Sequence, residues 1–546
     1  MAYDNMVTKV AILTGIMFFF AYSLFPSVIS DTKPMTMGTN LNVHYAIISE
    51  LMSTGNMFIT NNLYNDLPEN IRNATVPRDT RSIGDKIVLK GFLGVPFLYS
   101  VLISAFGEFY PYVTILLAVL TGFAFFLLVR ELFDENIALV SMILYFSFPF
   151  TIFISIMDVI DLTMPFLLFF FIGLYYFIKI MKTNKTIYYA ISGLFFSVAL
   201  ILRYENVILI APLALVLLIN KRKGINVKGV FIALVILLSV VIPILMLNNA
   251  LYGGYFKTGY KIEFGEFVSY GTTSFFNEQS IGHISLYLLG LYAPYTIIFI
   301  IGIMIFFMGY DAKKNQFDSG FKLIFGYTIL VFLAKIIVSS SYNLYGIENA
   351  VLNASFVRYI APVFFLLFPF ISYIILKVKD MRIIAVLLVA IVLLNFNTAI
   401  YGSDHMNGVS SQHSALKFWL DELNFVMNST DERSLIVVNK QDKIFFPERN
   451  ILLYGSIENM SSDDFTDSLI SAKRANISIY LFDPTSYINH GKSFTSTLLA
   501  KNYKLMYIGG GLYKMIYSSQ TRYKTFNDEL SDEQMANLLR RMRIFQ

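Results

Sequence analysis

Long apolar segments recur along most of this sequence, and they constrain the fold more than any other feature. The sequence is 56% hydrophobic and only 14% charged, whereas a soluble globular chain has about 25% charged residues. Many segments reach the roughly 20 apolar residues that a helix needs to cross a bilayer. They predict eleven membrane-spanning helices, which cover residues 10–28, 111–131, 136–154, 163–180, 187–202, 205–220, 229–248, 285–308, 321–340, 358–376 and 383–401.

Lysine and arginine are unevenly distributed between the loops that join these segments. Cytoplasmic loops of membrane proteins are rich in both residue types. With a cytoplasmic N-terminus, the predicted inner loops contain most of these residues, including Lys221, Arg222 and Lys223. The pattern therefore predicts a multi-pass protein of the plasma membrane. Every long loop, and the tail from about residue 403, then lies on the outer side of the membrane.

The sequence divides into a transmembrane domain, residues 1–402, and an extracytoplasmic tail domain, residues 403–546. Strand-like and helix-like segments alternate in the tail, which predicts a small α/β fold. The fold class is thus an all-α polytopic membrane domain followed by a small α/β domain. The predicted tail strands are 434–439, 477–483 and 504–508, the predicted helices are 463–475 and 493–502, and 509–511 is a predicted hairpin turn.

The first outer loop, residues 29–110, contains two segments that predict helices near the membrane interface. Residues 42–55 have the pattern of a short amphipathic helix. Residues 88–106 are apolar but are interrupted by Gly91, Gly94 and Pro96. The charge pattern favours an interfacial position for this second segment over a twelfth membrane span.

Composition excludes several classes of chemistry. The sequence has no cysteine, which rules out disulfides, Cys-based metal sites and thiol catalysis. The net charge of +5 is explained by cytoplasmic loop lysines. No Lys/Arg block is typical of a nucleic-acid surface, so we expect no nucleic-acid partner. No spacing of His, Asp and Glu predicts a metal site, so no cofactor is assigned, although a divalent metal stays open.

Ionisable residues collect on the predicted outer face. Asp158 and Asp161 lie at the tip of an apolar hairpin, where a buried carboxylate would cost several kcal/mol and so marks a site. Transfer of a sugar from a lipid-linked phosphosugar would need a carboxylate to deprotonate or orient the acceptor. It would also need cations that stabilise the leaving phosphate. The cations predicted to face this side include Lys86, Lys90, Arg203, Lys335 and Arg358.

Each of these residues also has a purely structural interpretation. Asp158 has the pattern of a solvated turn residue, and Asp161 that of an acid stabilised by a helix N-terminus. A lysine in the position of Lys335 can extend its side chain to the interface. Arg203 and Arg358 are typical of charged anchors at helix ends.

The order of these features resembles the GT-C membrane glycosyltransferases, in the branch of the protein O-mannosyltransferases and the lipid A aminoarabinose transferases. The stretches NVHYAIISELMSTGNMFITNNLYND and DKIVLKGFLGVPFLYSVLISAFG resemble the family's first outer loop and its segment before the second span. LYFSFPFTIFISIMDVIDLTMPF and ISGLFFSVALILRYENVILIAPL resemble two successive hairpins of the family. NNALYGGYFKTGY and FVRYIAPVF resemble a later outer loop and the start of a late span.

The resemblance implies an inverting hexosyltransferase that uses a polyprenyl-phosphate sugar at the outer face of the membrane. Its partners would be the lipid-linked donor, a protein, lipid or glycan acceptor, and membrane lipids. Asp161 matches the acid of the family's hairpin, and Lys90 matches a phosphate-binding basic residue. The remaining positions of the implied substrate-binding set are Arg203, Arg358, Lys335, Tyr260 and Asn42.

One departure from the family pattern concerns the catalytic base. The family places an acid a few residues before the Tyr of the first-loop helix, where this sequence has Asn40, Leu41 and Asn42. An amide does not accept a proton as a base, so Asp31, directly after the first span, is the candidate base and Asp161 supports it.

Two other functions stay open from the sequence. A flippase or transporter of lipid-linked sugars would need a polar path across the membrane, and the predicted inner halves of the spans contain few charges. A catalytically inactive scaffold would agree with the amides of the first loop. An oligosaccharyltransferase is disfavoured, because the sequence has one Trp and no WWDYG-like motif.

Overall fold

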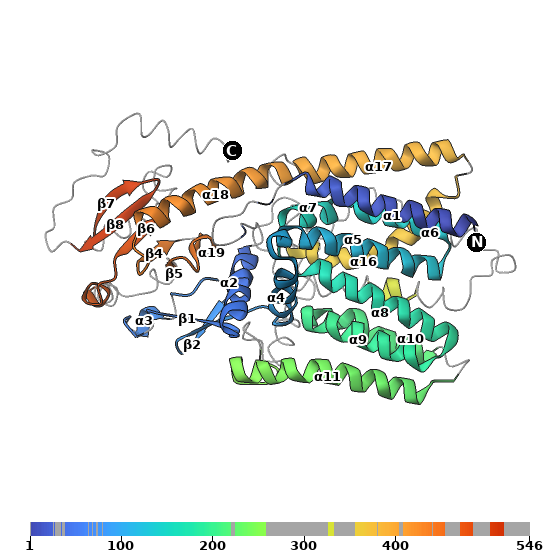
Figure 1. Ribbon diagram of the computed structural model, residues 1–546, viewed down its shortest axis with the longest axis horizontal. Helices are drawn as coiled ribbons and strands as arrows, with labels where there is room; N and C mark the ends of the chain where they lie inside the picture. Colours follow the sequence, from blue (N-terminus) through green and yellow to red (C-terminus); the bar gives the residue numbers. More distant parts are fainter. Residues whose placement is uncertain are drawn as a thin grey trace, which may run out of the picture. The chain divides into compact units, whose positions relative to one another are not determined.

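The computed structural model of the chain forms two compact units, which do not follow the order of the sequence (Figure 1). The helical unit comprises Met1–Ser27, Thr36–Gly38 and Phe92–His413, and the sheet unit comprises Val28–Met35, Thr39–Gly91 and Ser414–Gln546. Below, the range Thr39–Gly91 is called the first-loop segment. The structure describes residues 2–25, 27, 34, 39–63, 65–67, 69–72, 75–78, 80–219, 224–257, 326–331, 355–378, 380–402, 408–438, 441–453, 470–483 and 503–517.

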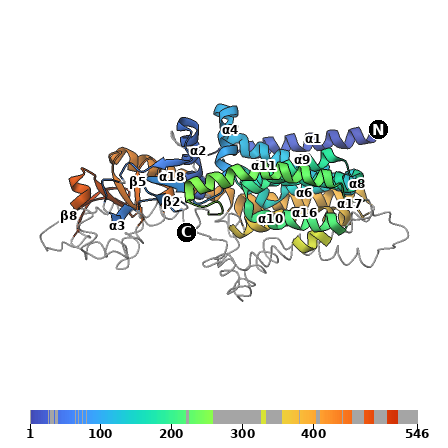
Figure 2. The ribbon, with the colours of Figure 1, turned by 90° about the horizontal axis from the view of Figure 1, so that it is seen from below.

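Helices make up the described part of the helical unit, and most of them run alongside one another in both views (Figures 1 and 2). They are α1 (Ala2–Ser23), α4 (Gly94–Phe106), the 3-10 helix η1 (Gly107–Tyr112), α5 (Val113–Leu132), α6 (Glu135–Ser147), α7 (Pro149–Met157), α8 (Thr163–Thr183), α9 (Thr186–Leu202), η2 (Tyr204–Asn206), α10 (Val207–Ile219), α11 (Val227–Tyr252), α16 (Ser355–Ile375) and α17 (Met381–Tyr401). Helix α18 (Val409–Ser429) follows them and lies mostly in the sheet unit.

Every predicted span within the described residues overlaps a helix of the structure. The predicted spans at 285–308 and, beyond residue 331, at 321–340 lie outside those residues. Among the described helices, five stretches are long and apolar enough to cross a membrane, or six if the bent pair α6 and α7 is one span. Helices α9 and α10 are apolar but shorter. The structure thus has several apolar helices, and the total of eleven stays a prediction.

Helix α4 does not continue straight into α5, although Gly94–Leu132 is one apolar stretch. The Tyr99 hydroxyl lies 3.2 Å from the Thr114 hydroxyl, whereas 15 residues of straight helix would separate them by about 22 Å. The chain therefore turns back at η1, which contains Pro111. Figures 1 and 2 show α4 at one end of the bundle, running across the axes of its neighbours.

The predicted span 136–154 is broken in the structure into α6 and α7, which are bent by 53°. Pro149 begins α7, and proline lacks the backbone N–H that would continue a helix. The residue before it, Phe148, accordingly has an extended backbone, with ψ of 127°. The Tyr22 hydroxyl of α1 donates a hydrogen bond to the Phe146 carbonyl next to the break. This contact satisfies a carbonyl in an apolar environment, where an unpaired one is costly.

The first-loop segment forms a small layered structure within the sheet unit. Strands β1 (Phe58–Thr60), β3 (Lys86–Leu89) and β2 (Thr80–Ile83) pair antiparallel in that spatial order. Helix α2 (Thr39–Thr54) packs on this sheet through a buried cluster of Val43, Ile47 and Leu89. The short helix α3 (Glu69–Arg72) lies between β1 and β2 in the chain. The predicted amphipathic helix at 42–55 is therefore part of α2.

A five-stranded sheet of order β5-β4-β6-β8-β7 forms the rest of the sheet unit. Strand β4 pairs parallel with β5 and β6, whereas β8 pairs antiparallel with β6 and β7. The predicted strands coincide with β4, β6 and β7, and the hairpin at 509–511 joins β7 to β8. Strand β5, a run of four residues, was not predicted from the sequence. The elements are β4 (Leu435–Val438), α19 (Asp442–Phe445), β5 (Asn450–Leu453), β6 (Ile479–Phe482), β7 (Tyr503–Gly509) and β8 (Leu512–Tyr517).

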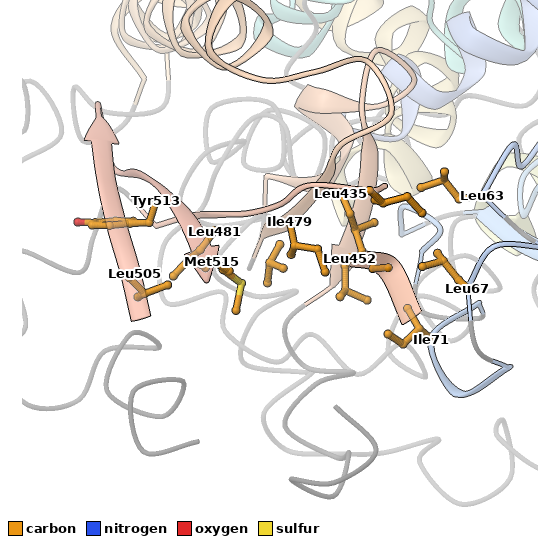
Figure 3. Close-up of a cluster of buried hydrophobic side chains, with 13 residues drawn as sticks. Leu63, Leu67, Ile71, Leu435, Leu452, Ile479, Leu481, Leu505, Tyr513 and Met515 are labelled. Carbon is orange, nitrogen blue, oxygen red and sulfur yellow. The ribbon is translucent and has the colours of Figure 1, made fainter. Parts of the chain in front are cut away.

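The first-loop segment and the tail sheet share one hydrophobic core (Figure 3). Leu63, Leu67 and Ile71 are buried in the same cluster as Leu435 and Ile479. Figure 3 shows the three first-loop side chains beside those of the tail strands. Burial of an aliphatic side chain contributes about 1.5–3 kcal/mol, so this core joins two parts of the chain that are hundreds of residues apart.

The predicted tail helices are described only in part. Residues 463–475 are described only from 470 onward, where they are helical up to 474, and 493–502 lies outside the described residues.

Candidate functional site

The turn between α7 and α8 buries both carboxylates of the predicted hairpin tip. Asp158 and Asp161 are each 1% exposed. The Asp161 Oδ2 atom accepts hydrogen bonds from the backbone N–H of Thr163, at 2.8 Å, and of Met164. These N–H groups open α8 and have no acceptor within the helix. Asp161 therefore caps α8, and the positive end of the helix dipole favours its negative charge.

Arg203 lies at the same end of the helical unit, because α8 and α9 pack against each other along their lengths. It ends α9 and is 3% exposed. Its Nη1 atom donates a hydrogen bond of 3.0 Å to the Thr163 hydroxyl. Thr163 thus contacts Asp161 through its backbone and Arg203 through its side chain. The fold thus brings together an acidic side chain, Asp161, and a basic one, Arg203, which were predicted separately from the sequence.

Helices α4 and α5 supply two further contacts to this turn that were not predicted from the sequence. The Asp161 backbone N–H donates to the Tyr99 hydroxyl at 2.8 Å. The same hydroxyl contacts the Thr114 hydroxyl, which donates to the Val159 carbonyl at 2.7 Å. Tyr99 and Thr114 are both fully buried. In the sequence, Tyr99 and Thr114 appear as hydroxyl-bearing residues in apolar segments. This pattern does not indicate which residues they contact.

A close backbone contact fixes α4 beside the end of α9. A Cβ atom placed on Gly94 would lie 2.4 Å from the Ile201 carbonyl oxygen. Such a contact is too close for any side chain, so this approach requires glycine. Ile201 stands two residues before Arg203, and Gly94 begins the helix that contains Tyr99. The residues Tyr99, Thr114, Asp161, Thr163 and Arg203 are called the α8 cap cluster below.

The predicted first-loop residues belong to the sheet unit. Asn42 and His44 are both 2% exposed on α2. A Cβ atom on Gly91 would lie 3.0 Å from the His44 Nε2 atom, so the chain after β3 passes close to α2. Lys90 is half-buried in this stretch, between Leu89 and Gly91. The fold therefore places Asn42 and Lys90 on neighbouring parts of one small structure.

The remaining predicted site residues are not described, or are described only in part. Asp31, Tyr260 and Lys335 lie outside the described residues. Arg358 belongs to α16, but its side chain is outside the description. Within the described residues, no group of three or more His, Asp or Glu side chains could hold a metal ion.

Comparison with known protein families connects this region to glycosyl transfer. Residues 98–247 match the family model described as dolichyl-phosphate-mannose-protein mannosyltransferase. This range begins within α4, ends within α11 and contains the α8 cap cluster. Among curated proteins, no sequence matches the chain.

Solved structures of membrane glycosyltransferases have a similar fold. ArnT from Cupriavidus metallidurans bound to undecaprenyl phosphate matches with a TM-score of 0.56 and 10% identity, over 93% of this chain and 97% of ArnT. The oligosaccharyltransferase AglB from Archaeoglobus fulgidus, in complex with an inhibitory peptide and a dolichol-phosphate, matches with a TM-score of 0.53 and 11% identity, over 95% of this chain and 75% of AglB. The same oligosaccharyltransferase with Zn and sulfate gives a TM-score of 0.53 and 13% identity, over 93% and 72% of the two chains.

The chain therefore has the GT-C fold of polyprenyl-phosphate-dependent glycosyltransferases, as the resemblance predicts. Its residues 98–247 are similar to the mannosyltransferase family model. The identity to the solved structures is low, so their likeness defines the fold. The oligosaccharyltransferase structure with Zn and sulfate shows that this fold is compatible with a bound divalent metal. Among the residues that the structure of this chain describes, no group of three or more His, Asp or Glu side chains could hold one.

Proposed function

We propose that the protein is an inverting membrane glycosyltransferase. It takes a hexose from a polyprenyl-phosphate donor and transfers it to a hydroxyl or amide of a protein, lipid or glycan acceptor. The reaction takes place at the outer face of the membrane, with the N-terminus in the cytoplasm and the tail domain outside.

The α8 cap cluster is the observation that carries this proposal. A buried arginine at the end of an apolar helix bundle is expensive to place and marks a functional site. The Arg203 Nη1 atom contacts the Thr163 hydroxyl at 3.0 Å, so the guanidinium lies at the start of α8. A guanidinium binds phosphate with charge-assisted hydrogen bonds. The cluster also lies inside the range that matches the mannosyltransferase family.

The proposed reaction balances as a single displacement. The acceptor oxygen or nitrogen attacks the anomeric carbon of the sugar, and the bond from that carbon to the phosphate oxygen breaks. The phosphate leaves with the electron pair and remains on the polyprenyl lipid. The acceptor proton passes to a carboxylate, for which Asp31 is the candidate, supported by Asp161. Arg203 stabilises the charge that develops on the phosphate, together with Lys90, Lys335 and Arg358, while Tyr260 and Asn42 contact the substrates.

A transfer assay tests this proposal directly. The full-length protein is reconstituted in vesicles and offered polyprenyl-phosphate hexoses, and transfer to peptide, lipid and glycan acceptors is measured. We expect Arg203→Gln to lower the turnover number by about 100- to 1,000-fold, which is the usual effect of removing one donor that stabilises developing charge. Lys185→Gln is the matched control, because Lys185 is exposed at the opposite end of the same helix.

Two further variants assign the acids. We expect Asp31→Asn to abolish transfer, and Asp161→Asn to reduce it while the protein stays folded. Full activity of Arg203→Gln would remove the α8 cap cluster from the mechanism. Movement of the lipid-linked sugar across the bilayer without any transfer would identify a flippase, and inactivity in both assays would identify a scaffold.

A further inference from the structure

The ion pairs Arg78–Asp442 and Asp66–Arg433 both join the first-loop segment to the tail within the sheet unit, and they differ greatly in burial. Arg78 pairs with Asp442 at 2.7 Å, and the Asp442 side chain is 0% exposed. Arg433 pairs with Asp66 at 2.6 Å, but these side chains are 60% and 37% exposed. Both pairs link the same two parts of the chain, so they form a natural comparison.

Both oxygens of the Asp442 carboxylate accept hydrogen bonds from Arg78. Asp442 Oδ1 accepts from Arg78 Nε at 3.0 Å and from Arg78 Nη2 at 2.7 Å. Asp442 Oδ2 accepts from the Arg78 backbone N–H at 2.6 Å. A backbone contact fixes the position of the chain itself, in addition to the position of a side chain. The guanidinium fork adds an orientation that a single contact would lack.

The part of the chain that Asp442 holds leads directly to the predicted first-loop site. Arg78 is followed by β2, which opens where the Thr80 hydroxyl and N–H both donate to the Pro77 carbonyl. Thr80 pairs with Leu89 across β2 and β3. Leu89 is the residue before Lys90, and it packs in the buried cluster under α2. Asp442 therefore fixes the β2–β3 hairpin, and Lys90 directly follows its second strand.

Helix α19 also reaches the first-loop segment from a second direction. Its four residues, Asp442–Phe445, pack against α2. All four are buried, and Phe445 contacts the Phe482 ring of β6 edge to face at 4.8 Å. Because α19 packs against strand β5 as well as against α2, it forms a rigid support for α2. Helix α2 contains Asn42 and His44.

We propose that α19 acts as a support that positions the first-loop segment for sugar transfer, with Asp442 as its positioning residue. This inference rests on the proposed function and concerns the role of the tail domain. The tail then acts on the donor side of the reaction, by holding α2 and the Lys90 turn. An acceptor-binding module would act on the other substrate.

The experiment compares the two ion pairs in the full-length protein in vesicles. We expect Asp442→Asn to lower the turnover number at least tenfold and to leave the acceptor KM unchanged, since a misplacement of about 1 Å costs on the order of 100-fold in rate. Arg78→Lys keeps the charge but lacks the guanidinium fork, so a smaller loss of the same kind is expected. Asp66→Asn, the matched control at the exposed pair, is expected to retain the wild-type rate.

Hydrogen–deuterium exchange supplies a measurement that does not depend on activity. In Asp442→Asn, amides of α2 and of 86–91 are expected to exchange faster, while those of the β7–β8 hairpin keep their wild-type rates. A rise confined to the acceptor KM, equal losses in Asp442→Asn and Asp66→Asn, or faster exchange throughout the five-stranded sheet would each overturn the inference. Failure of the proposed function is distinct, because the wild-type protein itself would then transfer no sugar.

Discussion

The two compact units hold buried charge in different ways. In the helical unit, Asp161 accepts from backbone N–H groups, and Arg203 donates to the hydroxyl of Thr163. In the sheet unit, Asp442 accepts from the guanidinium and the backbone of Arg78. The first set of contacts includes backbone N–H groups and a hydroxyl, whereas the second sets a positive and a negative group directly against each other.

The two arrangements suit different proposed roles. The α8 cap cluster holds an acidic and a guanidinium side chain at one end of an apolar helix bundle, where we propose that a phosphate binds. A guanidinium in direct contact with a carboxylate has its field largely cancelled, and what remains is a directional link between two chain segments. We therefore expect substitutions in the α8 cap cluster to act on transfer itself, and substitutions of the Arg78–Asp442 pair to act on the position and stability of the first-loop segment.

The largest effect on stability is expected from Asp442→Ala. Removal of one partner of a fully buried ion pair costs about 3–5 kcal/mol. Arg78 is 44% exposed, so its charge regains some hydration, and we expect a loss of about 2–3 kcal/mol in the free energy of local opening of the first-loop segment. Hydrogen–deuterium exchange of the α2 and 86–91 amides in the detergent-solubilised protein measures it. An unchanged stability would contradict the structural role of the pair.

The sequence predicted the local elements well because they depend on local pattern. Apolar runs produced the helices, and α8 begins at residue 163, as predicted. Alternating strand and helix patterns placed β4, β6 and β7. The break between α6 and α7 was missed, because apolar residues continue across Pro149 and hydrophobicity alone does not distinguish a straight span from a bent one. Strand β5 was missed because four residues carry too short a pattern.

Contacts between distant residues could not be read from the sequence. Arg78 and Asp442 are 364 positions apart, and no local pattern relates a loop arginine to a tail aspartate. The assignment of residues 29–110 to the membrane domain followed chain order, whereas the first-loop segment packs with the tail. In the site, Asp161 and Arg203 were selected by their charge in an apolar setting. Tyr99 and Thr114 carry no charge, so only the fold reveals that they contact this turn.

Tyr99→Phe tests whether the hydroxyl contacts matter in the helical unit. The substitution leaves the ring in place but removes the acceptor of the Asp161 N–H. A buried donor without an acceptor costs about 1–3 kcal/mol. We therefore expect the free energy of unfolding of the helical unit, measured by thermal unfolding, to fall by about 1–2 kcal/mol. Tyr112→Phe serves as the control, since Tyr112 is 40% exposed in the neighbouring η1. Equal losses in the two variants would show that burial of the hydroxyl is unimportant.

Asp161→Ala and Asp161→Asn separate the capping role of this residue from its charge. Alanine removes the cap of α8, at a cost of about 1 kcal/mol. Asparagine keeps an oxygen that accepts the same N–H groups, so it should retain stability while it loses charge and hence transfer activity. Asp134→Ala, at the exposed cap of α6 where Asp134 accepts from the Ile137 N–H at 2.9 Å, calibrates the cost of losing a cap. Wild-type activity of Asp161→Asn would leave Asp161 with a structural role alone.

The smallest effect is expected at the exposed pair, Asp66 and Arg433. A surface ion pair contributes about 0–1 kcal/mol, because water screens both charges and both side chains lose freedom. A double-mutant cycle with Asp66→Asn and Arg433→Gln should therefore give a coupling energy below about 0.5 kcal/mol that falls further in high salt. The same cycle on Asp442 and Arg78 should give a larger coupling that salt changes little. Because both pairs join the same two segments, equal couplings would mean that burial does not set their strength, and the contrast between the buried and the exposed pair would then lose its physical basis.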